Sequence, residues 1–558
     1  MPQQSGRHVR TPVLIVGAGP VGLCLALDLA YRDVASVVIE RTDGRIRHPK
    51  AGSLSSRTME FCRRWNIAEQ IRHCGFPRDY GLSMVFCTSM AGHTLGTHPY
   101  PSMDDDRAPA QSPEKKQRSP QLFFDPIIAA AARATGKVTF FYETELVSFA
   151  SDACGVEAEA KMRDSAEPLR VEADYLVGCD GAGSAVRERL GIGLKGNKAL
   201  DYSVAIFLRI AGLARRHDKG DAERYIFLGP EGTWGNLTAV DGKELWRLTV
   251  LGAKAHIDMN RFGADFWVRR ALGDTPADYS ILDVMPWRRS SLVAESYGSG
   301  RVFIAGDAAH TMSPTGGFGF NTGAGDAVDL SWKLAAAIQG WGGSGLLESY
   351  SIERQPVGAR NVGFATSNYF HLVSAANCED ILQDSASGEE VRKRIGREIK
   401  AATMTEWETL GVNLGYRYED SPICIADGMP APPDSPSDYV QTSRPGHRAP
   451  HAWRPDGSST IDLFGKGFVL LRFAGSDEPA SLMTAARQRG IPLSTILIDE
   501  PDIGRLYETR YVLVRPDGHT AWRGDRLPAD AMGLIDTVRG ERKTTNQGIG
   551  AAQAMTGR

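Results

Sequence analysis

Three glycine residues near the start of the chain have the spacing of a phosphate-binding turn. Gly17, Gly19 and Gly22 follow an apolar run, residues 13–16, that is suited to a buried parallel strand. In such a turn the first glycine allows the tight bend, the second lets a diphosphate approach the backbone, and the third lets the next helix pack closely. The diphosphate would lie at the helix N-terminus, where free N–H groups and the helix dipole favour negative charge.

The elements that must position this turn are also present in the sequence. A helix is expected through Leu23 to about Tyr31, and a β-rich run from Ser36 to Ile39 ends at Glu40. A carboxylate at that place accepts a hydrogen bond from an adenosine ribose hydroxyl. Strand, helix and acid together predict a βαβ unit that binds a dinucleotide. The alternative is a glycine-rich turn in an ordinary α/β domain.

A second apolar strand, within residues 175–190, ends at Asp180 and Gly181. Ser184 and Arg187 follow with helical spacing. A carboxylate at the carboxyl end of a strand points into the crevice where α/β sheets bind ligands. The alternative is a capped turn without a ligand.

A third stretch, residues 300–334, combines a strand, an acid and a glycine-rich loop. The strand ends at Gly306 and Asp307, and a loop from Pro314 leads into a helix near Asn321. Asp307 is suited to hold a polyol hydroxyl. The backbone N–H groups from Gly317 onward are suited to face an anion, because the helix dipole assists them.

Composition sets limits on the class of protein. The chain has 558 residues, of which 42% are hydrophobic and 23% charged, so two or three globular domains are expected. A net charge of -3 gives no strong field that would favour nucleic acid. The first ten residues lack the apolar core of a signal peptide, and no apolar run suits a membrane span, so we expect a cytoplasmic protein. The eight cysteines include no C-x-x-C pair, which argues against a zinc site or a redox disulfide.

Changes of pattern along the chain predict the domain organisation. Strand-like runs at short spacing suggest an antiparallel sheet inserted into the nucleotide-binding domain, and a proline-rich stretch marks a later boundary. Residues 101–120 are polar and proline-punctuated, and are expected to form an exposed loop. The expected parts are a nucleotide-binding domain (1–199 and 291–426), a sheet domain (200–290), a linker (427–455) and a small α/β domain (456–545).

Three motifs in order carry a family resemblance: GAGPVG…ER, CDGAGSAVR and GRVFIAGDAAHTMSPTGGFGFNTGAGDA. Together they resemble the single-component FAD-dependent aromatic hydroxylases of the para-hydroxybenzoate hydroxylase fold, from Val13 to about Arg360. With the terminal PDGHTAWRG, the chain is similar to the phenol and 3-(3-hydroxyphenyl)propionate hydroxylase branch, whose members append a thioredoxin-like domain. The resemblance implies an α/β fold: a Rossmann-like FAD-binding domain, an inserted mainly antiparallel substrate sheet, and a thioredoxin-like domain here without redox cysteines.

The resemblance also implies which residues hold the adenosine half of FAD. The glycine turn, with Pro20 inside it, would bind the diphosphate, Glu40 the ribose, and Arg41 would lie beside the adenine end. Lys50 stands where relatives usually have an arginine that contacts FAD. The lysine keeps the positive charge but loses bidentate phosphate binding.

The flavin half is implied in the same way. Gln121 and Asp307 would bind the ribityl chain, Asp180 belongs to a motif linked to both FAD and NAD(P)H, and Pro314 would lie against the isoalloxazine. Arg57 would face the cofactor or the nicotinamide donor from the following helix. The pyrimidine edge would be surrounded by Gly316, Gly317, Phe318, Gly319 and Asn321, and catalytic roles fall on Pro314, Gly317 and Arg57.

The implied reaction has two halves. NADH or NADPH donates a hydride to FAD, and the reduced flavin takes up O2 to give a C4a-hydroperoxide. The terminal oxygen then transfers to a ring carbon ortho or para to a hydroxyl or amino group. We also expect a small aromatic substrate and a homo-oligomer, namely a dimer. We expect no binding of nucleic acid, membrane or metal.

The group that deprotonates the substrate is not identified by the sequence. The phenol hydroxylase branch often has an aspartate where this chain has Gly52. His310 is expected to order its loop by hydrogen bonding rather than to act as a base. Substitutes for the base remain open, and each is more typical of a structural residue of the inserted sheet: Tyr202, Tyr225, Trp234, Trp246 and Arg247. Arg288 and Arg289, after Trp287, have two open interpretations: recognition of a substrate anion, or an exposed turn.

Three rival classes of protein have sequence requirements of their own. A flavin-dependent halogenase would carry a Trp-x-Trp-x-Ile-Pro segment, and the sequence has none. A flavin disulfide reductase would need a redox cysteine pair. A non-catalytic flavoprotein would not need the glycine-rich loop of residues 316–321, which is suited to reduced flavin.

Overall fold

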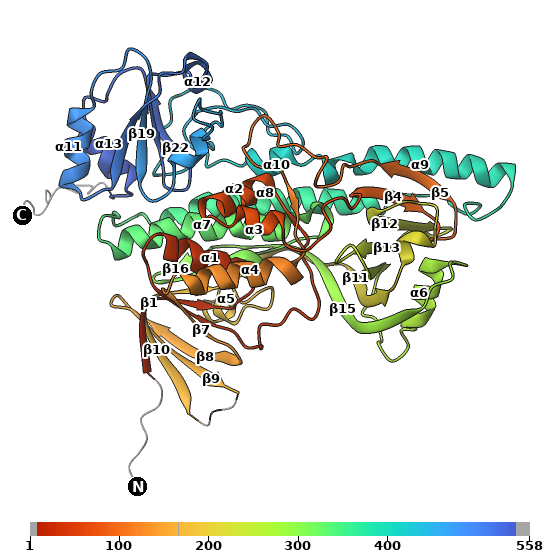
Figure 1. Cartoon of the computed structure of the whole chain (residues 1–558). Helices are drawn as coiled ribbons and strands as arrows, with labels where there is room; N and C mark the ends of the chain where they lie inside the picture. The colour runs from red at the N-terminus through yellow and green to blue at the C-terminus, as the bar shows by residue number, and fades with distance from the viewer. Residues whose placement is uncertain (1–7, 164, 166, 543–558) are drawn as a thin grey trace, which may run out of the picture.

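Three large sheets, two of eight strands and one of four, form the framework of the chain (Figure 1). The computed structural model describes residues 8–163, 165 and 167–542. Residues 1–7 of the expected nucleotide-binding domain and residues 543–545 of the expected C-terminal domain lie outside the described residues. Within the described ranges, no helix is long and apolar enough to cross a membrane.

The first sheet has five parallel strands in the order β7-β2-β1-β10-β17. Residues 13–16 of β1 are buried at its centre, as their apolar character predicts. The strand β16 and the β8–β9 pair extend the sheet in antiparallel fashion. The strands are β1 (His8–Val16), β2 (Ser36–Ile39), β7 (Val138–Phe141), β8 (Thr144–Ser151), β9 (Val156–Met162), β10 (Pro168–Gly178), β16 (Gly298–Ser299) and β17 (Val302–Ile304).

The carboxyl ends of β1, β10 and β17 lie side by side because their last residues are in register. In parallel strands the residues that follow these ends emerge at one edge of the sheet. Gly17, Asp180 and Asp307, which follow the three strands, are therefore brought together although they are far apart in the sequence. The predicted βαβ unit is confirmed.

Helix α1 packs between α4 and α7 over this sheet (Figure 1). The close packing depends on glycine: a Cβ on Gly306 would lie 2.9 Å from Val21 Cγ2, and a Cβ on Gly323 would lie 2.5 Å from the same atom. The third motif thus lies directly against the helix of the first. The helices are α1 (Pro20–Tyr31), α2 (Ser56–Arg64), α3 (Ala68–Arg72), α4 (Gln121–Ala134), α5 (Ala185–Arg189), α7 (Phe318–Ile338) and α8 (Glu348–Leu372).

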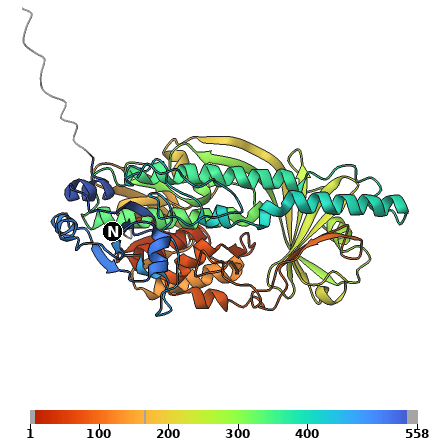
Figure 2. The same cartoon turned by 90° about the horizontal axis from the view of Figure 1, so that it is seen from above.

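The second sheet has the order β18-β15-β11-β14-β13-β12-β4-β5, and only the β12–β4 pair is parallel. Its outer strands β4, β5 and β18 lie outside residues 200–290, where the sequence suggested this sheet. Helix α9 (Ala386–Trp407) extends along the molecule towards this sheet beside α8 (Figure 2). The strands are β4 (Ser83–Cys87), β5 (Thr94–His98), β11 (Leu194–Ile210), β12 (Ala222–Gly229), β13 (Gly232–Ala239), β14 (Leu245–Ala253), β15 (Tyr279–Ala294) and β18 (His310–Thr311).

The C-terminal part is a βαβ unit followed by a hairpin and a helix, the predicted thioredoxin-like arrangement. Its sheet has the order β20-β19-β21-β22, with β19 and β20 parallel. Trp332 and Ala336 of α7 share a hydrophobic core with Phe468 and Leu470 of this part. The elements are β19 (Phe468–Arg472), α11 (Ala480–Gln488), β20 (Leu493–Leu497), α12 (Pro501–Tyr507), β21 (Tyr511–Val514), β22 (Thr520–Gly524) and α13 (Ala531–Val538).

The expectation that residues 101–120 form an exposed loop is wrong for much of the segment. Ser112 and Glu114 are each 1% exposed. The Ser112 hydroxyl donates to Glu60 Oε1 at 2.6 Å, and Arg63 pairs with Glu114 at 3.3 Å. Polar side chains in this segment are buried because cations and carboxylates of α2 and its surroundings pair with them.

Candidate cofactor and substrate site

The glycine turn has the geometry that its spacing predicts. Gly17 has φ +106°, and a Cβ there would lie 2.4 Å from the carbonyl oxygen of Cys179. A Cβ on Gly22 would lie 2.0 Å from the carbonyl oxygen of Gly17. A Cβ on Gly19 would meet no atom within 4 Å, so this residue faces open space at the N-terminus of α1. The turn fits a diphosphate.

Two alanine substitutions separate packing from binding in this turn. We expect Gly22→Ala to prevent folding or to cost at least about 2 kcal/mol, because its methyl group would overlap a backbone oxygen. Gly19→Ala should leave the apoprotein within about 1 kcal/mol of wild type but weaken FAD binding. Urea denaturation and FAD titration measure both effects. Equal stability of the two apoproteins would contradict the assignment.

Glu40, directly after β2, is held beside the turn by three hydrogen bonds. Its Oε2 accepts from the Ala18 N–H at 2.9 Å, and its Oε1 accepts from the Thr42 N–H and hydroxyl at 2.9 and 2.7 Å. A carboxylate has about four acceptor positions, so one remains for a ribose hydroxyl. Arg41 is exposed next to it.

Asp180 caps the start of α5 and keeps one oxygen free for a ligand. Its Oδ2 accepts from the Val186 N–H at 3.2 Å, while its buried Oδ1 has no partner among residues 8–163, 165 and 167–542. Arg187 donates to the Ala308 carbonyl at 3.2 Å, which links the second motif to the third. The orphaned oxygen fits a hydroxyl-bearing cofactor.

Asp307, shortly after β17, is exposed. The surrounding protein raises the pKa of its carboxyl, while His310 and Lys50 act in the opposite direction. The neighbouring backbone is held by Asp326, whose Oδ2 accepts from the Gly306 N–H at 3.1 Å and from His310 Nε2 at 2.8 Å. His310 therefore orders the loop, as its position in the sequence predicts.

Gln121 connects α4 to the segment that carries Lys50. Its Oε1 accepts from the Lys50 N–H at 3.0 Å, and its Nε2 donates to Asp125 Oδ2 at 3.0 Å. The Lys50 carbonyl in turn accepts from Arg247 Nη1 of β14 at 3.1 Å. Arg247 thus anchors the segment that carries Lys50. Burial raises the pKa of the Asp125 carboxyl to about 7.

This raised pKa predicts a pH-dependent stability. An ordinary aspartate has a pKa near 3.9, so the bound proton stabilises the folded protein at low pH, and this contribution is lost as the pH rises through about 7. We expect Asp125→Asn to raise the free energy of unfolding at pH 8 by up to about 4 kcal/mol, with little change at pH 4. Urea denaturation at both pH values measures this, with exposed Asp278→Asn as the control. A variant that follows the wild-type pH profile would argue against the buried proton.

The loop before α7 presents its backbone to the crevice. Gly316 and Gly317 have φ +85° and +68°, conformations that favour glycine. Pro314 and Gly317 are exposed, whereas the Phe318 side chain is buried against Ala365 and Val412. Phe318 and Gly319 can therefore serve a cofactor only through the N–H groups of the first turn of α7.

The Asn321 side chain does not face a cofactor. Its Oδ1 accepts from the Ser55 N–H at 2.8 Å and the Thr58 hydroxyl at 2.7 Å, and its Nδ2 donates to the Ser53 and Gly317 carbonyls at 3.1 and 2.8 Å. All its usual hydrogen-bonding positions are used by protein. The Asn321 side chain is therefore not available for the expected contact with the pyrimidine edge. Instead it positions the loop of residues 314–317, called the glycine loop below, through the Gly317 carbonyl.

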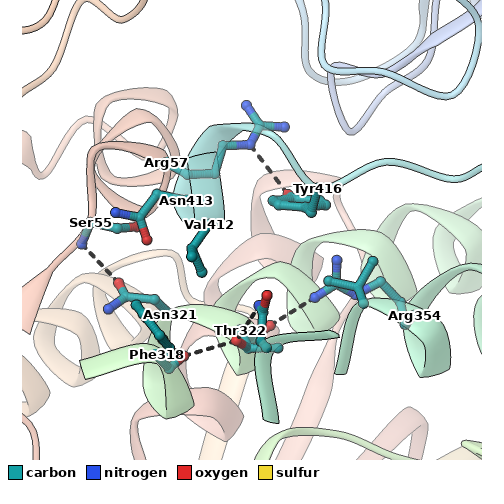
Figure 3. Close-up of a pocket in the computed structure, with 11 residues that line it drawn as sticks. Ser55, Arg57, Phe318, Asn321, Thr322, Arg354, Val412, Asn413 and Tyr416 are labelled. Carbon is teal, nitrogen blue, oxygen red and sulfur yellow. Dashed lines mark hydrogen bonds between the residues drawn. The ribbon is translucent and has the colours of Figure 1, made fainter. Parts of the chain in front are cut away.

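Arg57 also points away from the expected cofactor. Its guanidinium pairs with Glu60 at 2.7 Å and donates to the Asp517 carbonyl at 2.8 Å. Figure 3 shows its contact with the Tyr416 hydroxyl, at 3.4 Å. These contacts join α2 to the C-terminal part, so the catalytic and cofactor-binding roles expected for Arg57 are not supported. The small cavity beside it, about 20 Å³, has room for about one water molecule.

A buried polar network that sequence reasoning did not identify joins the second sheet to the glycine loop. Arg289, 2% exposed, donates to Asp201 Oδ1 at 3.2 Å and to the Ser313 hydroxyl at 2.8 Å. Tyr369 of α8 donates to Asp201 Oδ2 at 2.9 Å. Ser313 directly precedes Pro314, so the network holds the loop before α7 next to the second sheet. Tyr225, Trp234 and Trp246 instead lie in an apolar core.

Gly52 has a packing explanation. A Cβ there would lie 2.0 Å from Arg118 Nη1. Arg118 pairs with Glu223 at 3.0 Å, across to the second sheet. The guanidinium therefore takes the space into which a side chain at position 52 would extend.

Three motifs at one sheet edge, an open glycine turn and a second sheet joined to the glycine loop are the arrangement expected of an FAD-dependent hydroxylase. The chain belongs to the FAD-binding monooxygenases of the aromatic-ring hydroxylase family. The family described as FAD binding domain matches residues 10–365, and the one described as Aromatic-ring hydroxylase, C-terminal matches residues 442–540.

Individual relatives agree with this membership. FAD-dependent monooxygenase apdD of Emericella nidulans is 32% identical, covering 92% of this chain and 88% of its own. A putative polyketide hydroxylase of Streptomyces halstedii is 33% identical, with 93% and 95% covered. The structure of the rebeccamycin biosynthetic enzyme RebC with reduced flavin is 38% identical, with 96% and 100% covered and a TM-score of 0.89.

Proposed function

We propose that this FAD-dependent monooxygenase hydroxylates a ring carbon activated by a phenolic hydroxyl, with NADH or NADPH as the electron donor. Hydroxylation of an aromatic or polyketide substrate follows from the family. The observation that carries the finer proposal is the junction of Ser313 and the glycine loop with the polar network of the second sheet. It joins an expected flavin-binding loop to a sheet able to hold an aromatic ring.

The residues that would hold FAD are those of the three motifs. We assign the diphosphate to the turn from Gly17 to Gly22, the ribose to Glu40, and the ribityl chain to Asp307 with Gln121. Lys50 and Arg41 would supply positive charge near the cofactor, and Asp180 a free carboxylate oxygen. When bound, FAD supplies the redox chemistry that activates O2.

The chain itself must favour negative charge at the flavin and exclude water. The N–H groups at the start of α7 and the dipole of this 21-residue helix favour an anion beside Gly317. Pro314 would pack against the ring system. Arg289, Asp201 and Tyr369 hold the loop in place from a buried position, where water does not compete for their hydrogen bonds.

A panel of phenols and their amino, nitro and carboxylated analogues tests this function. We expect one or more phenols to accelerate NAD(P)H oxidation by the FAD-loaded protein and to gain one oxygen atom, measured by mass spectrometry. Product that requires chloride would indicate a halogenase. NAD(P)H oxidation that no panel compound stimulates, with no oxygenated product, would contradict the proposal.

A further inference from the structure

One face of the second sheet carries an apolar core, and the opposite face carries rows of polar side chains beside a smaller apolar cluster that includes Ile226. Neighbouring strands place Arg224, Thr238, Arg247 and Phe207 opposite one another in a row across four strands. Directly paired residues project to the same side of a sheet. A parallel row contains Asn236 and Thr249, paired with each other, and the intervening residues form the apolar core on the opposite face. Hydrogen-bonding groups thus follow one side of this sheet.

Glu406, near the end of α9, lies at the Arg224 end of this polar row. It is 2% exposed, and its Oε1 accepts from Arg224 Nη1 at 2.9 Å and from the Gly316 N–H at 3.3 Å. Gly316 belongs to the glycine loop. One carboxylate therefore contacts both the polar row and the loop assigned to the flavin.

The Glu406–Arg224 pair has unused hydrogen-bonding atoms. Glu406 Oε2 and Arg224 Nε are buried and have no hydrogen-bond partner in the part of the chain that the structure describes. An unpaired carboxylate oxygen in a buried place is costly unless something donates to it. The Arg224 side chain is 16% exposed, whereas the Glu406 side chain is fully buried behind it.

We propose that Glu406, held by Arg224, binds the ring hydroxyl of the aromatic substrate, an inference that rests on the proposed function. The phenolic O–H donates to Oε2, and Arg224 keeps the carboxylate oriented. When the phenolic O–H donates to the carboxylate, electron density increases at the ring carbons ortho and para to the hydroxyl. These are the carbons to be oxygenated. Because the ion pair is already neutral, it selects a neutral hydroxyl over a carboxylate.

Binding of a phenol and its methyl ether to the FAD-loaded protein tests this assignment. We expect wild type to bind 2-naphthol about 10- to 100-fold more tightly than 2-methoxynaphthalene, measured by isothermal titration calorimetry, since the ether cannot donate to a charged acceptor. Glu406→Gln keeps an oxygen for Gly316 and Arg224 but loses the free acceptor. Its preference for the phenol should fall to about threefold or less, while exposed Glu408→Gln should behave as wild type.

Four results would overturn the assignment: equal binding of the two probes to wild type, no binding of 2-naphthol, a full preference retained by Glu406→Gln, or loss of FAD from that variant. The last would show that the carboxylate serves the loop alone. The proposed function is judged separately by oxygenated product. A wild type that prefers 2-naphthol but oxygenates no phenol supports Glu406 and refutes the hydroxylase proposal; the reverse pattern refutes only Glu406.

Discussion

Asp307→Ala protein should purify almost colourless while remaining folded. The carboxylate follows β17 at the sheet edge shared with the glycine turn, and it is exposed. Each hydrogen bond from a ribityl hydroxyl to a charged acceptor is worth roughly 1.5–3 kcal/mol, so losing two would weaken FAD binding at least about 100-fold. The neighbouring Gly306 backbone is held by Asp326 and not by Asp307, so the apoprotein should unfold at the wild-type urea concentration.

The ratio of flavin to protein absorbance after purification measures this effect, followed by titration of each apoprotein with FAD. Asp307→Asn keeps an acceptor but not the charge and should show an intermediate affinity. Glu157→Ala, an exposed change on β9, is the control for handling losses. Yellow, fully loaded Asp307→Ala protein would refute the ribityl assignment.

Arg515→Met should destabilise the whole protein by about 3–5 kcal/mol, the second large effect. Arg515 follows β21 and is buried, and it contacts Glu353 at 2.5 Å, Asp329 at 3.0 Å and Asp517 at 2.7 Å. Lys333 is the other cation paired with Asp329 and Glu353 in this cluster of described residues. Removing the guanidinium leaves three carboxylates with one lysine in a buried place.

The loss should depend on pH with a definite sign. Burial favours the neutral form of the three acids; in wild type, however, Arg515 and Lys333 hold the pKa of Glu353 down at about 2. Burial already raises the pKa of Asp329 to about 8 in the wild-type protein. Without Arg515 the pKa values of Glu353 and Asp517 in the folded protein should rise as well, above those in the unfolded chain. The variant is then more stable at pH 5 than at pH 8, because the retained protons are lost as the pH rises.

Urea denaturation at the two pH values measures the predicted loss, and limited proteolysis reports whether the C-terminal part separates. The control is Arg505→Met, which removes an exposed ion pair with Asp502 and should change stability by less than about 1 kcal/mol. If Arg515→Met were no worse than this control, the buried cluster would not be what joins the C-terminal part to the FAD-binding part.

The cluster also changes how the C-terminal part is understood. Its strands carry no redox cysteine pair, so chemistry of that kind does not explain it. The structure shows packing within the chain: Arg515 reaches Asp329 of α7 and Glu353 of α8, and Trp332 lies in a shared core. Truncation after Asp427 would therefore expose an apolar surface of the FAD-binding part.

The sequence alone determined features that depend on neighbouring residues. The spacing of Gly17, Gly19 and Gly22 is a statement about local backbone geometry, and the structure has that geometry. Apolar runs ending at Asp180 and at Asp307 predicted strands whose carboxyl ends carry acids. Parallel pairing then requires these ends to meet at one edge, whatever the intervening chain does.

Only the tertiary structure decided which partner each polar side chain has. Arg57 follows the cofactor segment in sequence, yet it binds a carbonyl of Asp517, and Glu406 on an ordinary-looking amphipathic helix reaches Gly316. Residue spacing reveals backbone conformation because that is governed by near neighbours. Ion pairs and buried hydrogen bonds join remote segments, so they are determined when helices and sheets pack together.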